Sequence, residues 1–114
     1  MLFKKEHKDM ILNGTKTATR RDWKKPMVKV GNIYKAKLKM LSKEYFAKIK
    51  VIKLYKQKLY DMTNEDAKKE GYSNLKEFEK VWIEINGDCN NQLTGNWNGN
   101  LVVYVIEFEV INGI

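Results

Sequence analysis

Residues 11–21 read ILNGTKTATRR, and the fold can be worked out from this stretch outward. Its apolar start looks like the end of a helix, and Asn-Gly at 13–14 predicts where that helix stops, because glycine accepts a positive φ without strain. The threonine-rich residues 17–21 then predict an extended strand. Both arginines of the chain, Arg20 and Arg21, lie on this strand. The stretch therefore predicts a helix that turns directly into a charged strand.

Strands are also predicted further along the chain, where apolar and polar residues alternate. Residues 33–41 and 45–59 have this pattern, with lysines on the polar face. The alternation slips at Val51-Ile52, and an extra residue in a strand predicts a β-bulge. Residues 101–110, LVVYVIEFEV, are apolar on both faces, so we expect this strand near the centre of the sheet.

Three segments have helical signals. Residues 6–14 predict a brief helix before the charged strand. Residues 63–70 predict a second, with a threonine N-cap, acids in the first turn and a glycine after the last turn. A third begins at about Leu75, where Asn74 and Glu77 have the spacing of a capping box in an asparagine variant.

These elements add up to one domain over residues 1–114 of the α+β class. We expect a curled sheet or small β-barrel of about five or six strands, with two or three helices at its rim. A polar loop rich in Asn and Gly fills residues 86–100, and loops of that length tend to have a function of their own.

The composition narrows the possible classes of protein. The chain has 114 residues, of which 43% are hydrophobic and 32% charged, as in a compact globular protein. Cys89 is the single cysteine and His7 the single histidine, so we expect no internal disulfide, no metal site and no cofactor. There is no signal-peptide core and no long apolar run, which predicts a cytoplasmic protein that does not enter a membrane. We expect a monomer.

Charge is distributed unevenly. Residues 1–60 hold 18 Lys/Arg against 4 Asp/Glu, while residues 61–114 hold 4 against 10. Such a basic half favours a polyanionic partner, with RNA as the leading candidate. The alternative is that lysine simply serves as the general surface residue of this chain. The pairing of Arg20 with Arg21 favours a site, since lysine replaces arginine poorly where bidentate phosphate contacts are needed.

The motif in residues 11–21 resembles the signature of the ASCH domain, a member of the PUA-like superfamily. Two further segments agree: GYSNLKEFEKVWIEING at 71–87 resembles the helix that follows the barrel strands, and VVYVIEFEV at 102–110 resembles the closing strand. The resemblance implies a PUA-like pseudo-barrel with a cleft and a role connected with RNA. Family members include RNA-binding proteins, small amidohydrolases that deacetylate N(4)-acetylcytidine, and a reported ribonuclease.

The amidohydrolase members use a lysine, a threonine and a glutamate, which by motif position fall on Lys16, Thr19 and Glu77. The resemblance thus implies that Thr19 is a nucleophile, Lys16 its base and Glu77 a positioning or proton-transferring group. Each residue also has a structural alternative: a solvated lysine, an ordinary strand threonine and half of a capping box.

Two geometric conditions follow for this chemistry. Residues 16 and 19 would lie on opposite faces of a regular strand, so Lys16 must sit in the turn before the strand or a bulge must separate the two. Backbone N–H groups of residues 14–16 are the expected donors to the oxyanion.

Substrate binding or nucleic-acid binding is expected of a second set of residues around the motif. Trp23 and Trp97 are candidates for stacking on a base, although aromatic residues in small domains are more often core. The set is Gly14, Thr17, Arg20, Arg21, Trp23 and Trp97.

Three functions remain open. The first is a module that binds RNA or a modified nucleoside. The second is an amidohydrolase that acts on N(4)-acetylcytidine. A metal-assisted ribonuclease ranks last, because the carboxylates show no spacing suited to a pair of metal ions.

Overall fold

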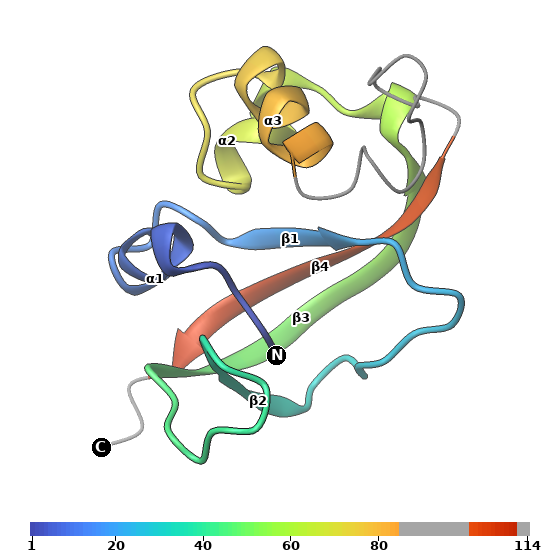
Figure 1. The fold of residues 1–114 in the computed structure, drawn as a ribbon. Coiled ribbons are helices and arrows are strands. Elements are labelled where there is room, and N and C mark those ends of the chain that lie inside the picture. Colours follow the sequence, from blue (N-terminus) through green and yellow to red (C-terminus); the bar gives the residue numbers. More distant parts are fainter. Residues whose placement is uncertain (85–100, 112–114) are drawn as a thin grey trace.

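The computed structural model describes residues 1–84 and 101–111. Within these ranges the chain forms three α-helices, one 3-10 turn and four strands (Figure 1). In chain order they are α1 (Lys5–Leu12), β1 (Ala18–Arg21), β2 (Ile33–Ala36), β3 (Ala47–Lys58), the 3-10 turn Leu59–Asp61, α2 (Asn64–Lys69), α3 (Leu75–Trp82) and β4 (Val102–Ile111).

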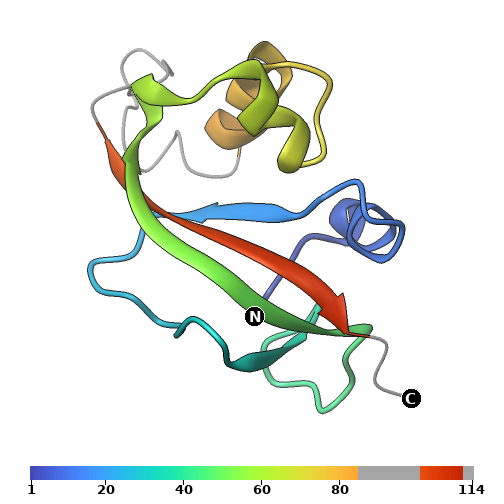
Figure 2. The same ribbon diagram turned by 180° about the vertical axis from the view of Figure 1, so that it is seen from behind.

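The four strands form one antiparallel sheet in the order β1-β4-β3-β2. The predicted central position of the last strand is confirmed, because β4 pairs with β1 on one side and β3 on the other. The predicted bulge is also confirmed by a register shift between Val51 and Lys53. The long strands β3 and β4 bend and twist together, so the sheet forms a curled half-barrel (Figures 1 and 2). The predicted α+β class is therefore correct.

The predicted number of five or six strands differs from the four strands of the described ranges. The strand expected over 33–41 already ends at Ala36, and residues 37–46 do not form a strand. Leu38 and Met40, which share the apolar face that the alternation implied, are 38% and 75% exposed, so the described residues do not cover that face. Alternation predicts a strand only where one face is buried.

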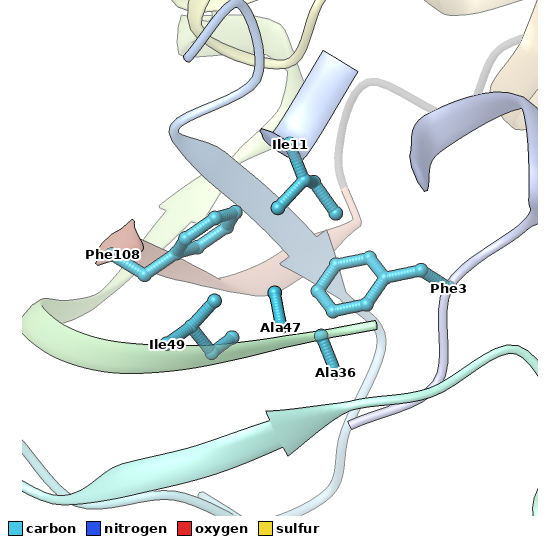
Figure 3. Packing of buried hydrophobic residues seen from close by; sticks show 6 residues of the cluster. All are labelled: Phe3, Ile11, Ala36, Ala47, Ile49 and Phe108. Carbon is cyan, nitrogen blue, oxygen red and sulfur yellow. The ribbon is translucent and has the colours of Figure 1, made fainter. Parts of the chain in front are cut away.

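One hydrophobic cluster fixes α1 and the N-terminal segment to the sheet. Ile11 of α1 and Phe3 meet side chains of β2, β3 and β4 around Phe108 (Figure 3). The buried members are Phe3, Ile11, Ala36, Ala47, Ile49 and Phe108.

A second cluster lies under α2 and α3. Phe78 and Trp82 of α3 share it with Val103 of β4 and with Leu59 in the 3-10 turn. In both views α2 and α3 lie together on one side of β1, while α1 lies beside the start of that strand (Figures 1 and 2). The edge strand β1 therefore runs between two separately packed groups of helices.

The turn that leads into β1 is tied to both of its neighbours. Gly14 has φ +84°, which ends α1 as the sequence predicts. The backbone N–H of Lys16 donates to Met10 O at 2.9 Å, and that of Thr17 donates to Lys69 O at 2.7 Å. Lys16 thus lies before β1, held between α1 and the end of α2.

Within the described ranges, no helix has the length and apolar character needed to cross a membrane.

Gly71, directly after α2, faces the same turn. Its φ is +99°, and a Cβ there would lie 2.7 Å from Met10 Sδ. We expect Gly71→Ala to lower the free energy of unfolding by about 1–3 kcal/mol, measured by urea denaturation.

Gly31→Ala is the matched control, because its φ is +89° but a Cβ would meet no atom within 4 Å. Gly31→Ala measures only the loss in the free energy of unfolding that comes from the positive φ, roughly 1–2 kcal/mol. The excess cost at Gly71 should disappear in a Met10→Ala background. Equal losses for the two glycines would show that Met10 moves aside freely.

Candidate functional site

A cavity of about 330 Å³ lies beside β1, between the N-terminal segment with α1 and the helices α2 and α3. Thr19 and Arg20 both line it, although neighbouring residues of a strand point to opposite faces. The cavity therefore lies at the free edge of β1. Its lining combines the charged groups Lys4, Lys16, Arg20, Arg21, Asp22 and Glu70 with the rings of Phe3, His7, Tyr72, Phe78 and Trp82.

The carboxylate of Glu70 is the centre of the charged lining. Its Oε1 lies 2.9 Å from Lys16 Nζ, and its Oε2 lies 2.8 Å from Arg20 Nη1. Lys16 Nζ also donates to the Glu70 backbone carbonyl at 3.1 Å. Lys16, Arg20 and Glu70 are 2%, 5% and 3% exposed, so this triad is almost completely removed from water. One carboxylate is shared between two buried cations.

Arg20 uses the rest of its guanidinium on protein groups as well. Nε and Nη2 donate to Gln57 Oε1 at 3.2 and 2.8 Å, and Nη2 lies 3.8 Å from Asp66 Oδ2. Because Nη1 donates to Glu70, all three nitrogens of the guanidinium form hydrogen bonds. Arg20 thus joins β1, β3 and α2. This structural role uses the N–H donors that were expected to bind a phosphate.

Burial lowers the pKa of the Lys16 ammonium, and the attraction of Glu70 opposes that change. The charged form loses its water shell, while the carboxylate at 2.9 Å restores part of the stabilisation. Arg20 and Arg21 lower the pKa of Lys16 further.

Thr19 lies on β1 next to this triad and is 5% exposed. Its Oγ1 accepts a hydrogen bond from Arg21 Nε at 3.3 Å, and its own hydroxyl proton remains available as a donor. Because Lys16 precedes the strand, the opposite parity of 16 and 19 does not separate them, and both line the cavity.

Across the cavity, His7 Nε2 and the Tyr72 hydroxyl are 2.6 Å apart and connect α1 to the segment after α2. Burial, helped by the charge of Lys16, lowers the pKa of His7 to about 4. Burial also raises the pKa of Tyr72 to about 12. At neutral pH this pair is uncharged, with one proton shared along the contact.

The structure does not bring every predicted residue to the cavity. Gly14, Thr17, Trp23 and Glu77 are absent from its lining, and Trp97 lies outside the described residues. Trp23 is partly buried and packs against a core cluster, with its ring centroid 6.2 Å from that of Tyr104.

Glu77 caps α3 instead. Its carboxylate accepts a hydrogen bond from Ser73 N at 2.9 Å, and its backbone N–H donates to Asn74 Oδ1 at 2.9 Å. The capping alternative describes this position, and the carboxylate beside Lys16 comes from Glu70.

The expected oxyanion donors are also engaged elsewhere. The N–H groups of Gly14, Thr15 and Lys16 donate to Ile11 O, Asn13 Oδ1 and Met10 O. The proposal of an oxyanion hole in residues 14–16 is therefore wrong, since the turn uses these donors to close the end of α1.

Sequence reasoning missed Glu70, although one signal pointed to it. Glu70 is the C-cap residue of α2, where the partial negative charge of the helix end disfavours a carboxylate. An acid in that position indicates a partner of opposite charge from elsewhere in the chain. His7 and Tyr72 carry no comparable local signal.

No group of three or more His, Cys, Asp and Glu side chains suited to a metal ion occurs in residues 1–84 and 101–111.

Removal of the charge of Glu70 should be costly. Glu70→Gln leaves Lys16 and Arg20 without their shared carboxylate, and we expect a loss of about 3–5 kcal/mol in the free energy of unfolding by urea denaturation. Glu65→Gln is the matched control, because Glu65 pairs at 3.4 Å with Lys68 and both are exposed. That change should cost under about 0.5 kcal/mol. Similar losses for the two variants would contradict a central role of Glu70.

Comparison with known proteins gives a consistent result. A search of curated proteins found no match. Among solved structures, an ASCH domain from Lactobacillus crispatus JV V101 matches with a TM-score of 0.71 and 17% identity, over 90% of this chain and 69% of that chain. Protein EF3133 from Enterococcus faecalis V583 matches with a TM-score of 0.65 and 17% identity, over 93% of this chain and 67% of that one. Hypothetical protein PH0355 matches with a TM-score of 0.65 and 22% identity, over 97% and 96%.

At these identities the structural matches establish the fold alone. The family model of the ASCH domain, however, matches residues 1–112, nearly the whole sequence. The chain belongs to the ASCH domain family.

Proposed function

We propose that the cavity binds one nucleoside, either as a free modified nucleoside or as a unit of an RNA strand. The observation that carries this proposal is the combination of a buried, hydrogen-bonding charged triad with aromatic walls in one cavity. A nucleobase has a flat apolar face and a polar edge, so it matches both parts of such a lining.

The size of the cavity supports a single nucleoside. About 330 Å³ is at the lower end of small-molecule sites, which span roughly 300–1,000 Å³. A long open groove would suit a strand better than one base.

RNA remains the favoured source of that nucleoside. Exposed lysines follow β3 toward its C-terminal end, at Lys53, Lys56 and Lys58. Cations at such positions attract a phosphate backbone without reading its sequence. Part of the basic excess of residues 1–60 is used internally, however, since Lys16 and Arg20 both pair with Glu70.

Binding should depend on Thr19 and not on Thr17. Thr19 is buried in the cavity lining, whereas Thr17 is an exposed neighbour in the same stretch. We expect Thr19→Val to weaken binding of N(4)-acetylcytidine about tenfold by isothermal titration calorimetry, since it removes a buried hydrogen-bonding group. Thr17→Val should leave the Kd unchanged. Equal effects, or no binding of N(4)-acetylcytidine or any of the four ordinary nucleosides by the wild type, would contradict the proposal.

Amide hydrolysis is a second candidate, favoured by the lowered pKa of Lys16 and by a buried threonine, Thr19, in the lining of the same cavity. In this reaction, the Thr19 hydroxyl attacks the acetyl carbon of N(4)-acetylcytidine while Lys16, in its neutral form, takes the hydroxyl proton. Lys16 then gives that proton to the departing N4, which releases cytidine. Water hydrolyses the acetyl ester and frees Thr19 and acetate.

Glu70 would hold Lys16 in position through this sequence, the role that the family resemblance gave to Glu77. The side-chain contact of 2.9 Å between Glu70 and Lys16 supports this reassignment. Arg21 would assist, because its donation to Thr19 Oγ1 stabilises negative charge on that oxygen.

A pair of glutamate variants distinguishes the two assignments. Glu70→Asp keeps the charge but shortens the side chain, so we expect cytidine release, followed by chromatography, to fall about a hundredfold or more. Glu77→Gln should stay near the wild-type rate, with Thr19→Val as the inactive reference. A large loss in Glu77→Gln with activity retained in Glu70→Asp would restore the first assignment. No cytidine release by the wild type would exclude this substrate.

A further inference from the structure

Arg21 is half-buried and differs from the buried cations Lys16 and Arg20 of the cavity in having no carboxylate in contact. Its Nη2 donates to Leu2 O at 2.6 Å and its Nε to Thr19 Oγ1 at 3.3 Å. The guanidinium also lies over the Phe3 ring, 5.0 Å from the centroid. These contacts fix its orientation, yet within the described ranges Arg21 forms no ion pair and Nη1 has no hydrogen-bond partner.

The charges of the lining do not balance around it. Each oxygen of Glu70 is already taken, one by Lys16 and one by Arg20. Asp22 also lines the cavity but is exposed and forms no ion pair with Arg21. Lys4 adds another exposed cation to the lining. The cavity therefore carries more positive than negative charge.

A partly buried cation with no carboxylate in contact is costly, and a ligand that brings an anion relieves that cost. Burial lowers the pKa of Arg21, and the charge of Glu70, which is not in contact with it, opposes that change. Arginine still remains charged at neutral pH, so the positive charge of Arg21 favours a ligand with an anionic group. A fork with an unused nitrogen suits a phosphate, which accepts charge-assisted hydrogen bonds from guanidinium groups.

The remaining lining specifies what the anion is attached to. Tyr72, Phe78 and Trp82 form an aromatic wall on the α2 and α3 side. Arg21 comes from β1 and Lys4 lies just before α1, so these cations belong to other elements than the aromatic wall. A ligand that fills both parts has a flat ring at one end and an anionic group at the other.

We propose that the cavity takes its nucleoside as a nucleoside 5′-monophosphate, with Arg21 as the residue that binds the phosphate. This inference rests on the proposed function, since it names the form in which the nucleoside is bound. Arg21 then determines specificity, whereas Arg20 on the same strand serves the fold.

The test compares each of the four nucleosides, and N(4)-acetylcytidine, with its 5′-monophosphate by calorimetry on the full chain at fixed salt. We expect the monophosphate of the preferred base to bind about tenfold more tightly or better than the nucleoside. Arg21→Gln should remove this difference, and Arg21→Lys, which keeps the charge but loses the fork, should keep part of it. Lys24→Gln is the charge-matched control, because Lys24 is exposed and outside the cavity lining. It should retain the full difference.

The outcomes separate the two proposals. If a nucleoside and its monophosphate bind the wild type equally, the phosphate inference fails while nucleoside binding stands. If inorganic phosphate alone binds as tightly as the monophosphate, Arg21 holds an anion without a base and the inference also fails. If no nucleoside or monophosphate binds, the proposed function itself is wrong. The wild-type comparison decides these cases even if the Arg21 variants unfold.

Discussion

The Glu70 carboxylate, held between Lys16 and Arg20, is the interaction on which the rest of the structure depends. It joins the turn after α1, the edge strand β1 and the end of α2, whereas α1 and α2 place their buried side chains in separate hydrophobic clusters. Burial of three charges is expensive, and a pure hydrocarbon contact at this place could be equally stable. What the triad adds is direction, because each oxygen of the Glu70 carboxylate contacts one cation, Lys16 at 2.9 Å and Arg20 at 2.8 Å. The relative placement of α1, β1 and α2 follows from that geometry, and so does the cavity between them.

Local signals in the sequence predicted much of the fold. Neighbouring residues alone predict three features that the structure contains. They are the bulge after Val51, the Thr63 cap of α2 and the central position of β4. The prediction of a strand was wrong for residues 37–41, because alternation predicts which face a strand would bury but not whether other residues cover that face. Met40 and Leu41 look like strand residues and face water.

The site was harder to predict than the fold, for a physical reason. Lys16, Thr19, Arg20 and Arg21 were found because they are concentrated in one short motif. Glu70 is more than fifty residues away from Lys16, and no local periodicity reports that a charge in one helix will meet a charge in a distant turn. Glu77 satisfies a local rule, the helix cap, and that rule accounts for its position fully.

β1 lies at one edge of the sheet. A short strand at the edge of a sheet offers unpaired backbone groups to any other strand, including a second copy of the chain. Here the neighbouring space is occupied by helices on both sides and lined by two arginines and a lysine, whose charges repel the same arrangement on another molecule. The residues that line the cavity therefore also hinder pairing with another strand at this edge of the sheet.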